Sequence, residues 1–465
     1  MFKRVLPVVI AFTLFAVLVA PVAAADEPHV YHLTVHPGAP PAAALRYRLM
    51  PDPSDLTAGN AAPVYLSALL LAPKLTDEQQ QQLDKWTEMP LEKLPRDQVQ
   101  KFLDDCYKTA FAQAEIAARR DFCHWDMPWR EQSFMALLPH LNGMRQLTRA
   151  LALRAKLELA EGHFDNATRT LATGFAMARH VGQGDSVLIE ALVGAAMARS
   201  LSLPLRDWAA APNAPSLYWS LAALPRPFVD AGAALRREHL ILWLPDLRAA
   251  RDRTITPEQW KRIVEQAVIA TNAGAPTNHG LADQIKIALD VAATLPRAKE
   301  YLIEQGMPKA TVDAMPAFQA VAIWSYDDYE RKLEAIEKWF GVPYWQAQAG
   351  LARATEEFMR APESNTNVLL AFVPAITRAY TSCVQGDREI AAMQTIEAIR
   401  AYAAAHGGKL PQTLEDLTEQ SPAPIDPMTG ANFDYMPGDG GFVLEAAPVA
   451  DRPETGLKYQ VTLVP

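Results

Sequence analysis

Cysteine is scarce in this chain, with three residues, Cys106, Cys123 and Cys383, among 465. Such a small and odd number excludes a fold held together by a disulfide framework. Cys106 lies on a predicted helix from Asp97 to about Asp121, and Cys123 follows its end. A helical rise of about 1.5 Å per residue places the two roughly 25 Å apart, whereas a disulfide needs Cα atoms within about 7 Å. We therefore predict no bridge between them and interpret Cys106 as a buried, apolar thiol.

Clustered positive charge is also missing. The formal net charge is −9, and adjacent arginines occur as pairs such as Arg119-Arg120 and Arg236-Arg237. Nucleic acid and anionic lipid surfaces attract clustered cations, so neither is expected as the main partner. The sequence has no G-x-S-x-G elbow, H-E-x-x-H pair, Walker loop or dinucleotide-binding glycine run. We therefore expect no cofactor and no metal, and we assign no catalytic residue.

Long apolar runs are limited to the first residues. Lys3 and Arg4 precede an apolar segment that reaches Val22, and small residues follow up to Ala25. This order is typical of a secretory signal peptide, which predicts cleavage between Ala25 and Asp26. An uncleaved anchor helix is the alternative, because about 18 apolar residues approach the length that spans a bilayer. No cysteine follows the run, and we find no second spanning stretch, so we predict a soluble protein of the periplasm or cell envelope.

The remaining chain is rich in helix-forming patterns. Half of its residues are hydrophobic, and apolar positions recur at helical spacing between Gly and Pro residues. We predict a mainly α fold, with an irregular body of tetratricopeptide-like helical hairpins and a small C-terminal α+β module. The predicted division is a signal peptide at 1–25, an extended N-terminal arm at 26–60, a helical domain at 61–386 and a C-terminal helix with a small antiparallel sheet at 387–465.

One helical hairpin has a more specific pattern. Between Leu151 and Arg179, small and large residues, with Gly162 and Gly174 among them, follow the offsets of a tetratricopeptide unit. Small residues are needed where two antiparallel helices cross closely. Gly162 and Gly182 are also read as helix stops. Since no convincing neighbours recur at the 34-residue period, we predict a single tetratricopeptide-like hairpin, with a solenoid as the alternative.

The tail changes character near Asp387. An amphipathic helix, Glu389–His406, is followed by three predicted strands, Phe433–Tyr435, Phe442–Glu445 and Tyr459–Leu463. This order, with Leu-Pro, Asp-Pro and Gly between its parts, resembles the soluble end of type II secretion pseudopilins. The N-terminal methylation motif and the long assembly helix of that family are absent, so the resemblance does not imply pilus assembly.

Other blocks spread over the chain resemble a family of uncharacterised exported proteins of planctomycete-type bacteria. Where the family pattern leads us to expect Asn, this chain has Ser216. The resemblance implies export and a shared architecture, and it carries over no catalytic or binding residue. The blocks are Leu45–Pro51, Gly59–Ala62, Ala118–Trp125 and Ala214–Pro227.

Two clusters contain metal-ligand residue types. His29, His32 and His36 lie on a predicted strand, where His32 and His36 share a face roughly 13 Å apart, too far to chelate one ion. Cys123 and His124 are adjacent, so their side chains point apart, and no second pair follows at zinc-binding spacing. We interpret the histidines as a solvated face, and the stretch from Cys123 as a helix end whose Trp125 and Trp129 cap a core.

Acidic residues gather in two further places. Asp327, Asp328 and Glu330 lie among aromatic residues, a composition found in glycosidase sites. Tyr326, Tyr329, Leu333, Ile336 and Phe340 recur at helical spacing, however, so we interpret the stretch as a core-facing helix. In the tail, Asp426, Asp434 and Asp439 lie in turns without the spacing of a calcium loop, and we interpret them as solvated.

These patterns leave two classes of function open. The first is a non-enzymatic scaffold or binding module whose partner is an envelope protein or peptide. The second is an exported hydrolase acting on glycan or peptide, for which the aromatic and acidic region is the only support. Two inward-pointing carboxylates about 5 to 9.5 Å apart in a deep cleft would favour the hydrolase.

Overall fold

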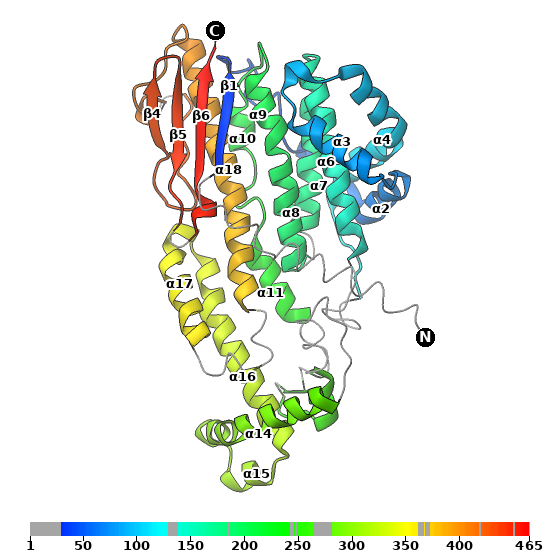
Figure 1. Ribbon diagram of the computed structural model, residues 1–465, viewed down its shortest axis with the longest axis vertical. Coiled ribbons are helices and arrows are strands. Elements are labelled where there is room, and N and C mark those ends of the chain that lie inside the picture. The colour runs from blue at the N-terminus through cyan, green and yellow to red at the C-terminus, as the bar shows by residue number, and fades with distance from the viewer. Residues whose placement is uncertain are drawn as a thin grey trace. The chain divides into compact units, whose positions relative to one another are not determined.

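The periodic stretches form helices in the computed structural model (Figure 1). Helices account for 64% of the structure and accompany a small C-terminal sheet of four strands, which confirms the predicted fold class. The structure describes residues 29–128, 138–183, 186–241, 246, 249–250, 252–263, 281–360, 367, 373–417, 420–449 and 452–464. The predicted signal peptide, with Ala25 and Asp26, and the predicted cap residue Trp129 lie outside these residues.

Contacts divide the chain into two compact units. The larger comprises 22–125, 139–234 and 381–465, and the smaller takes 1–21, 126–138 and 235–380. In the larger unit the helices are α2 Ala62–Leu71, α3 Asp77–Glu88, α4 Arg96–Ala118, α6 Pro139–Ala160, α7 Phe164–Gln183, α8 Leu188–Ser200, α9 Ser202–Ala210 and α10 Tyr218–Ala222. Short 3-10 helices in the two units are Pro53–Asp55, Leu91–Lys93, Lys338–Gly341, Leu414–Leu417 and Pro453–Thr455.

Helices α6 and α7 form the predicted hairpin. Gly162, with φ +75°, ends α6, and the amides of Gly162 and His163 donate to the carbonyls of Leu159 and Glu158. This pattern is a Schellman cap. Gly182 is not a helix stop, which corrects the prediction from the sequence. It lies inside α7, and a Cβ at Gly194 on α8 would lie 2.7 Å from the Gly182 Cα atom, because the two helices cross there.

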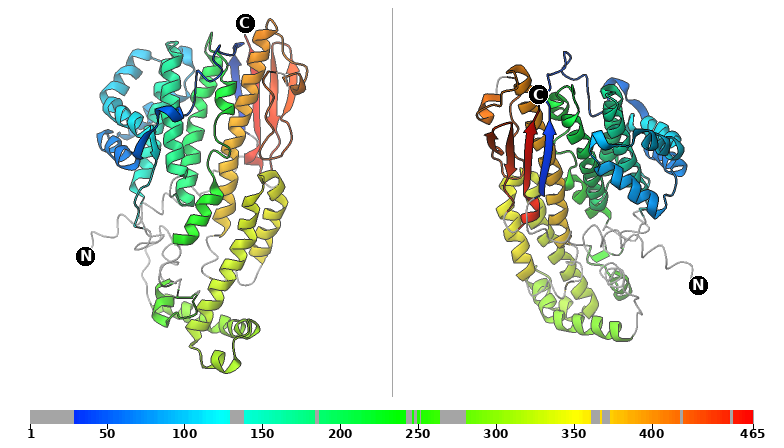
Figure 2. Two further views of the ribbon diagram at one scale, coloured as in Figure 1. Left: turned by 180° about the vertical axis from the view of Figure 1, so that it is seen from behind. Right: turned by 45° about the horizontal axis from the view of Figure 1, so that its top comes forward.

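The sheet unites the two ends of the described chain. Its strand order is β1-β6-β5-β4, with β1 (His29–Val35) parallel to β6 (Leu457–Leu463) and the other pairs antiparallel. β5 spans Gly441–Ala446 and β4 spans Asp434–Gly438. β1 and β6 lie side by side in both views of Figure 2. The strand predicted in the N-terminal arm is therefore a strand of the C-terminal sheet.

Helix α18, Val373–Ala405, begins well before the predicted start at Glu389, so the predicted boundary at residue 387 falls inside it. Two of its arginines are fully buried. Arg388 pairs with Asp426 of the tail and also donates to the carbonyls of Thr455 and Ala447. Because an unpaired buried charge is costly, these contacts fix the tail on the helix.

Arg400 holds three further segments together. It pairs with Glu397, 2.7 Å away on the same helix, and donates to the carbonyls of His36 after β1 and Ala214. Ser216 donates to the Glu397 carbonyl and accepts from the amide of Tyr218. The Ala214–Pro227 block thus contributes a contact between the α9–α10 connection and α18.

The helix predicted from Asp97 to about Asp121 ends earlier, at Ala118. Arg120–Phe122 form strand β3, which pairs in parallel with β2, Thr57–Asn60. Asn60 closes this pair, because its amide group donates to the His124 carbonyl and accepts from the His124 amide. Because this contact joins residues far apart in sequence, helical periodicity does not show it. The predicted end of α4 therefore lies too far along the chain.

The three thiols are free. The prediction that Cys106 and Cys123 are not bridged is confirmed. Cys123 and Cys383 are buried, and burial raises the pKa of both thiols far above the ordinary value. Cys106 is only partly buried on α4, which corrects its interpretation as a core residue.

Among the described residues, the smaller unit includes helices α14 Leu281–Glu304, α15 Lys309–Ala314, α16 Ala317–Glu337 and α17 Tyr344–Arg360. Helix α11, Ala231–Ile241, has residues in both units. Helix α14 contains Pro296 in its interior. Trp324, Tyr329 and Leu333 of α16 are buried, as its core-facing interpretation requires.

Candidate functional site

A cavity of about 550 Å³ lies in the larger unit. Its walls come from the segment before β2, the C-terminal end of α4 and facing turns of α6 and α7. Five arginines line it, beside four carboxylates, in a chain whose net charge is −9. We call it the arginine pocket; the arginines are Arg46, Arg48, Arg119, Arg154 and Arg169, and the acids are Asp52, Asp55, Glu115 and Asp165.

Two of these arginines form exposed ion pairs. Arg46 contacts Asp165 of α7 through two hydrogen bonds, of 3.3 and 2.9 Å, with side chains 55% and 63% exposed. Arg48 Nε lies 2.9 Å from Asp52. The amide and hydroxyl of Ser54 donate to Asp52 and lower the pKa of its carboxyl group. Water screens exposed ion pairs and leaves them weak, so another anion can compete for both arginines.

Arg154 of α6 is held more firmly. Its guanidinium contacts Glu115 at 2.8 Å and Glu158 at 3.0 Å, and it lies over the ring of Phe111. Glu158 is buried, which raises its pKa, and it also accepts from Thr170 at 2.7 Å. Arg154 therefore has a fixed position in the pocket wall.

Arg119 and Arg169 have no carboxylate partner among the described residues. Arg119 follows the last residue of α4, where its carbonyl accepts the amide of Thr57 and fixes the backbone. Arg169 contacts the side chain of Asn166 within α7. Both side chains are exposed. No described ion pair occupies either guanidinium group.

Two of the family-like blocks meet at this place. Gly59 has φ +135° and donates its amide to Asp121, and an added Cβ would lie 3.1 Å from the Arg120 guanidinium. The contacts of Gly59 and Asn60 fix the segment that follows Arg119. Arg119-Arg120 reads in the sequence as an unspecific pair of charges. The signal that could have shown the pocket is a second pair of closely spaced arginines, Arg46 and Arg48.

Next to these strands lies a buried polar cluster. Trp125 stacks on His140 with ring centroids 4.0 Å apart, and His140 Nε2 lies 3.3 Å from Glu190. The hydroxyl of Tyr65 lies 2.9 Å from His180, whose pKa burial lowers to about 4. Trp125 thus packs on a core, as predicted, but it follows a strand and not a helix end.

Cysteine and histidine, which a nucleophilic catalytic site uses, both occur at this place, but they lack the accessibility and the low thiol pKa that such a site needs. Burial raises the pKa of the Cys123 thiol so far that it stays protonated and unreactive. His124 is exposed, and its backbone makes the contacts to Asn60. His140 and Glu190, which sequence reasoning did not single out, are buried core residues.

The three N-terminal histidines do not converge. His32 is exposed on the outer face of β1, and the carbonyl of His36 accepts from Arg400. The backbone of His29 pairs with Leu457. Among the described residues, no group of three or more His, Cys, Asp or Glu side chains is placed to hold a metal ion.

The two neighbouring aspartates of the aromatic region, Asp327 and Asp328, have different partners. Asp328 is buried and lies 2.8 Å from Arg331 and 2.9 Å from Lys332, and Asn367 donates to it. Asp327 instead accepts from Tyr301, so the two neighbouring carboxylates diverge. They do not form the inward-facing pair that a glycosidase needs.

The three aspartates of the tail differ in their exposure to solvent. Asp434 and Asp439 are exposed, as predicted. Asp426 is buried at 1% exposure and pairs with Arg388, so its interpretation as a solvated residue is wrong. It also accepts from Met428 and Thr429, so its carboxylate organises the turn that follows it.

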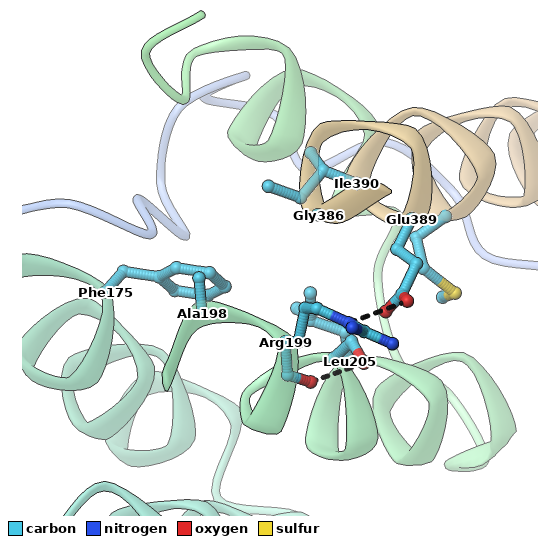
Figure 3. A pocket seen from close by; sticks show the side chains of 9 residues that line it. Phe175, Ala198, Arg199, Leu205, Gly386, Glu389 and Ile390 are labelled. Carbon is cyan, nitrogen blue, oxygen red and sulfur yellow. Dashed lines mark hydrogen bonds and ion pairs between the residues drawn. The ribbon is translucent and has the colours of Figure 1, made fainter. Parts of the chain in front are cut away.

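A second cavity, between α7, α8, α9 and α18, is too small for a ligand (Figure 3). Its volume is about 10 Å³, close to that of one water molecule. Arg199 and Glu389 form an ion pair of 3.0 Å across it, with Phe175 and Leu205 beside them. This cavity is a packing feature, and the arginine pocket is the stronger candidate site.

Comparison with known proteins adds no relative: no protein-family model matches the chain, and neither a curated protein nor a solved structure matches it. Within the described residues, one helical run, Leu188–Ala210, is long and apolar enough to cross a membrane by length and composition. We predicted no such stretch after the N-terminal apolar segment. The run is 67% buried inside the protein, as the core helices of soluble proteins also are, so it is weak support for a span.

Proposed function

We propose that the protein is an exported, non-enzymatic binding module of the periplasm or cell envelope, and that the arginine pocket holds its ligand. The observation that carries the proposal is a cavity of about 550 Å³ containing two arginines without carboxylate partners among the described residues. Ligand sites are concave and place a few polar groups toward the ligand. The signal-like segment before Asp26 supports export.

The alternative of an exported hydrolase receives less support. A hydrolytic site needs a nucleophile or a general base within reach of the scissile bond. Asp328 is buried in ion pairs, and Cys123 is a buried thiol with a strongly raised pKa. The carboxylates that line the arginine pocket include three that pair with its arginines. This arrangement favours binding over hydrolysis.

Affinity capture from the envelope fraction tests the pocket. The bait is the mature chain from Asp26, beside the pocket variant Arg119→Ala/Arg169→Ala and a matched variant, Arg96→Ala/Arg353→Ala. Arg96 and Arg353 are exposed arginines outside the pocket, on α4 and α17. We expect the wild-type chain and the matched variant to retain the same envelope component, and the pocket variant to lose it.

Loss of the component from both variants would mean that net charge, and not the pocket, determines capture. Equal retention by all three baits would remove the arginine pocket as the ligand site. Thermal unfolding of each bait checks that the substitutions leave the fold intact, which we expect because the four side chains are exposed.

A further inference from the structure

We infer that the group recognised in the arginine pocket is a phosphate. This inference rests on the proposed function and specifies its ligand class. The starting point is charge: Arg119 and Arg169 lack carboxylate partners among the described residues, while Arg154 is fixed between Glu115 and Glu158. An anion that enters the cavity therefore finds two guanidinium groups available without breaking any described ion pair.

The number of guanidinium groups in the pocket matches a phosphate better than a simple carboxylate. The ion pairs of Arg46 with Asp165 and of Arg48 with Asp52 are exposed, so both arginines can turn to a ligand at little cost. The pocket then offers guanidinium forks from the segment before β2, from the end of α4 and from α7. A carboxylate has two oxygen atoms to accept such donors, whereas a phosphate ester presents three and carries more charge.

The lining also limits how the rest of the ligand is recognised. Among the described residues that line the cavity, none has an aromatic side chain. Nucleobases and sugars are usually held by stacking on aromatic rings. The apolar residues Leu45, Met50 and Pro51 offer limited contact beside the arginines. Binding therefore depends on the phosphate itself, whether it is free or attached to a lipid.

Calorimetric titration of the mature chain with inorganic phosphate tests this inference, with acetate titrated in parallel. We expect phosphate to bind the wild-type chain and the matched variant Arg96→Ala/Arg353→Ala more tightly than acetate. The pocket variant Arg119→Ala/Arg169→Ala should bind phosphate at least about tenfold more weakly, since it loses two charge-assisted contacts. Arg119→Lys/Arg169→Lys, which keeps the charge and loses the forks, should fall between them.

The source of the phosphate is decided by sedimentation with vesicles of phosphatidylcholine alone or with added phosphatidic acid. Binding only to vesicles that contain phosphatidic acid, with loss of binding in the pocket variant, supports a lipid phosphate. Binding of inorganic phosphate in the titration, without binding to either kind of vesicle, supports a soluble phosphate. The inference is overturned if phosphate binds no better than acetate, or if the pocket variant binds phosphate as well as the wild type. If the pocket variant nevertheless loses its envelope component, the proposed function stands and only the ligand class is wrong.

Discussion

At the scale of single residues, buried charges organise the larger unit. The guanidiniums of Arg388 and Arg400 are both fully buried, and each has a carboxylate and two carbonyl groups as acceptors. Removing one partner of such a pair would leave the other charge buried and unpaired, at a cost of about 3 to 5 kcal/mol. Neither arginine is accessible to a ligand, which separates their structural role from that of the pocket arginines.

Asp387 of α18 is the buried acid whose ionisation bears most directly on stability. Burial raises the pKa of its carboxyl group from 3.8 to about 6, against the opposing effects of the Phe228 amide and Arg226. Because the folded state holds the proton more tightly than the unfolded chain, stability falls as the pH rises from about 4 to 6. At pH 7.5 the ionised carboxylate therefore costs about 3 kcal/mol at most.

We expect Asp387→Asn to unfold at a higher urea concentration than the wild type at pH 7.5, and at nearly the same concentration at pH 4. The amide oxygen can still accept from Phe228, so the local contact is kept. Asp434→Asn, at an exposed acid of β4, is the control for the change in net charge. A difference that does not depend on pH would contradict the role assigned to the Asp387 ionisation.

At the scale of elements, small residues decide how closely the helices approach. A Cβ at Gly174 of α7 would lie 2.8 Å from a methyl carbon of Leu201, which matches the reason for a small residue at that tetratricopeptide-like position. The crossing of α7 and α8 is closer still. There a Cβ at Gly194 would meet the Ala178 carbonyl and the Gly182 backbone, each within 2.8 Å. Neither backbone can give way without separating the two helices.

Gly194→Ala should therefore lower the free energy of unfolding by about 1 to 3 kcal/mol, the usual cost of overpacking a core. Gly386→Ala is the matched control, because Gly386 is also inside a helix but an added Cβ would be 3.8 Å from its nearest neighbour, Arg199. There, the better helix propensity of alanine should increase stability by up to about 1 kcal/mol. Equal effects of the two substitutions in urea unfolding would contradict a close crossing at Gly194.

Helical periodicity predicted most elements but could not predict where tertiary pairing replaces a helix. The residues after Ala118 continue a helical pattern, yet they pair with β2, about sixty positions earlier. Pro296 reads as a break, yet α14 continues through it. The arginine pocket was missed for the same reason, since its arginines come from four separate stretches of the sequence.

At the scale of the whole molecule, the predicted signal cleavage is compatible with the sheet. β1 begins at His29, so a cut between Ala25 and Asp26 leaves the whole strand available to pair with β6. A cut a few residues later would remove part of β1 and expose the edge of β6. The predicted cut therefore leaves the four-stranded sheet complete.

We expect the protein recovered from the envelope or periplasmic fraction to have the intact mass of a chain beginning at Asp26. Ala25→Leu should block the cut, because the residue before the cleavage site must be small, and the precursor should then accumulate in the membrane fraction. Ala24→Leu is the control, since the position between the two small residues is tolerant. Full-length mass for the wild-type chain would instead favour the uncleaved anchor.

The sequence by itself determined the mainly helical class, the three tail strands, the unbridged state of Cys106 and Cys123 and most helix positions, because these follow from local periodicity and chain geometry. Only the tertiary structure decided that β1 joins the C-terminal sheet, that Asp426 is buried, and that Arg46, Arg48 and Arg119 line one cavity. Each of these depends on contacts between segments distant in sequence. Such contacts form because buried charges and strand edges need partners, and residue spacing does not show which partner that is.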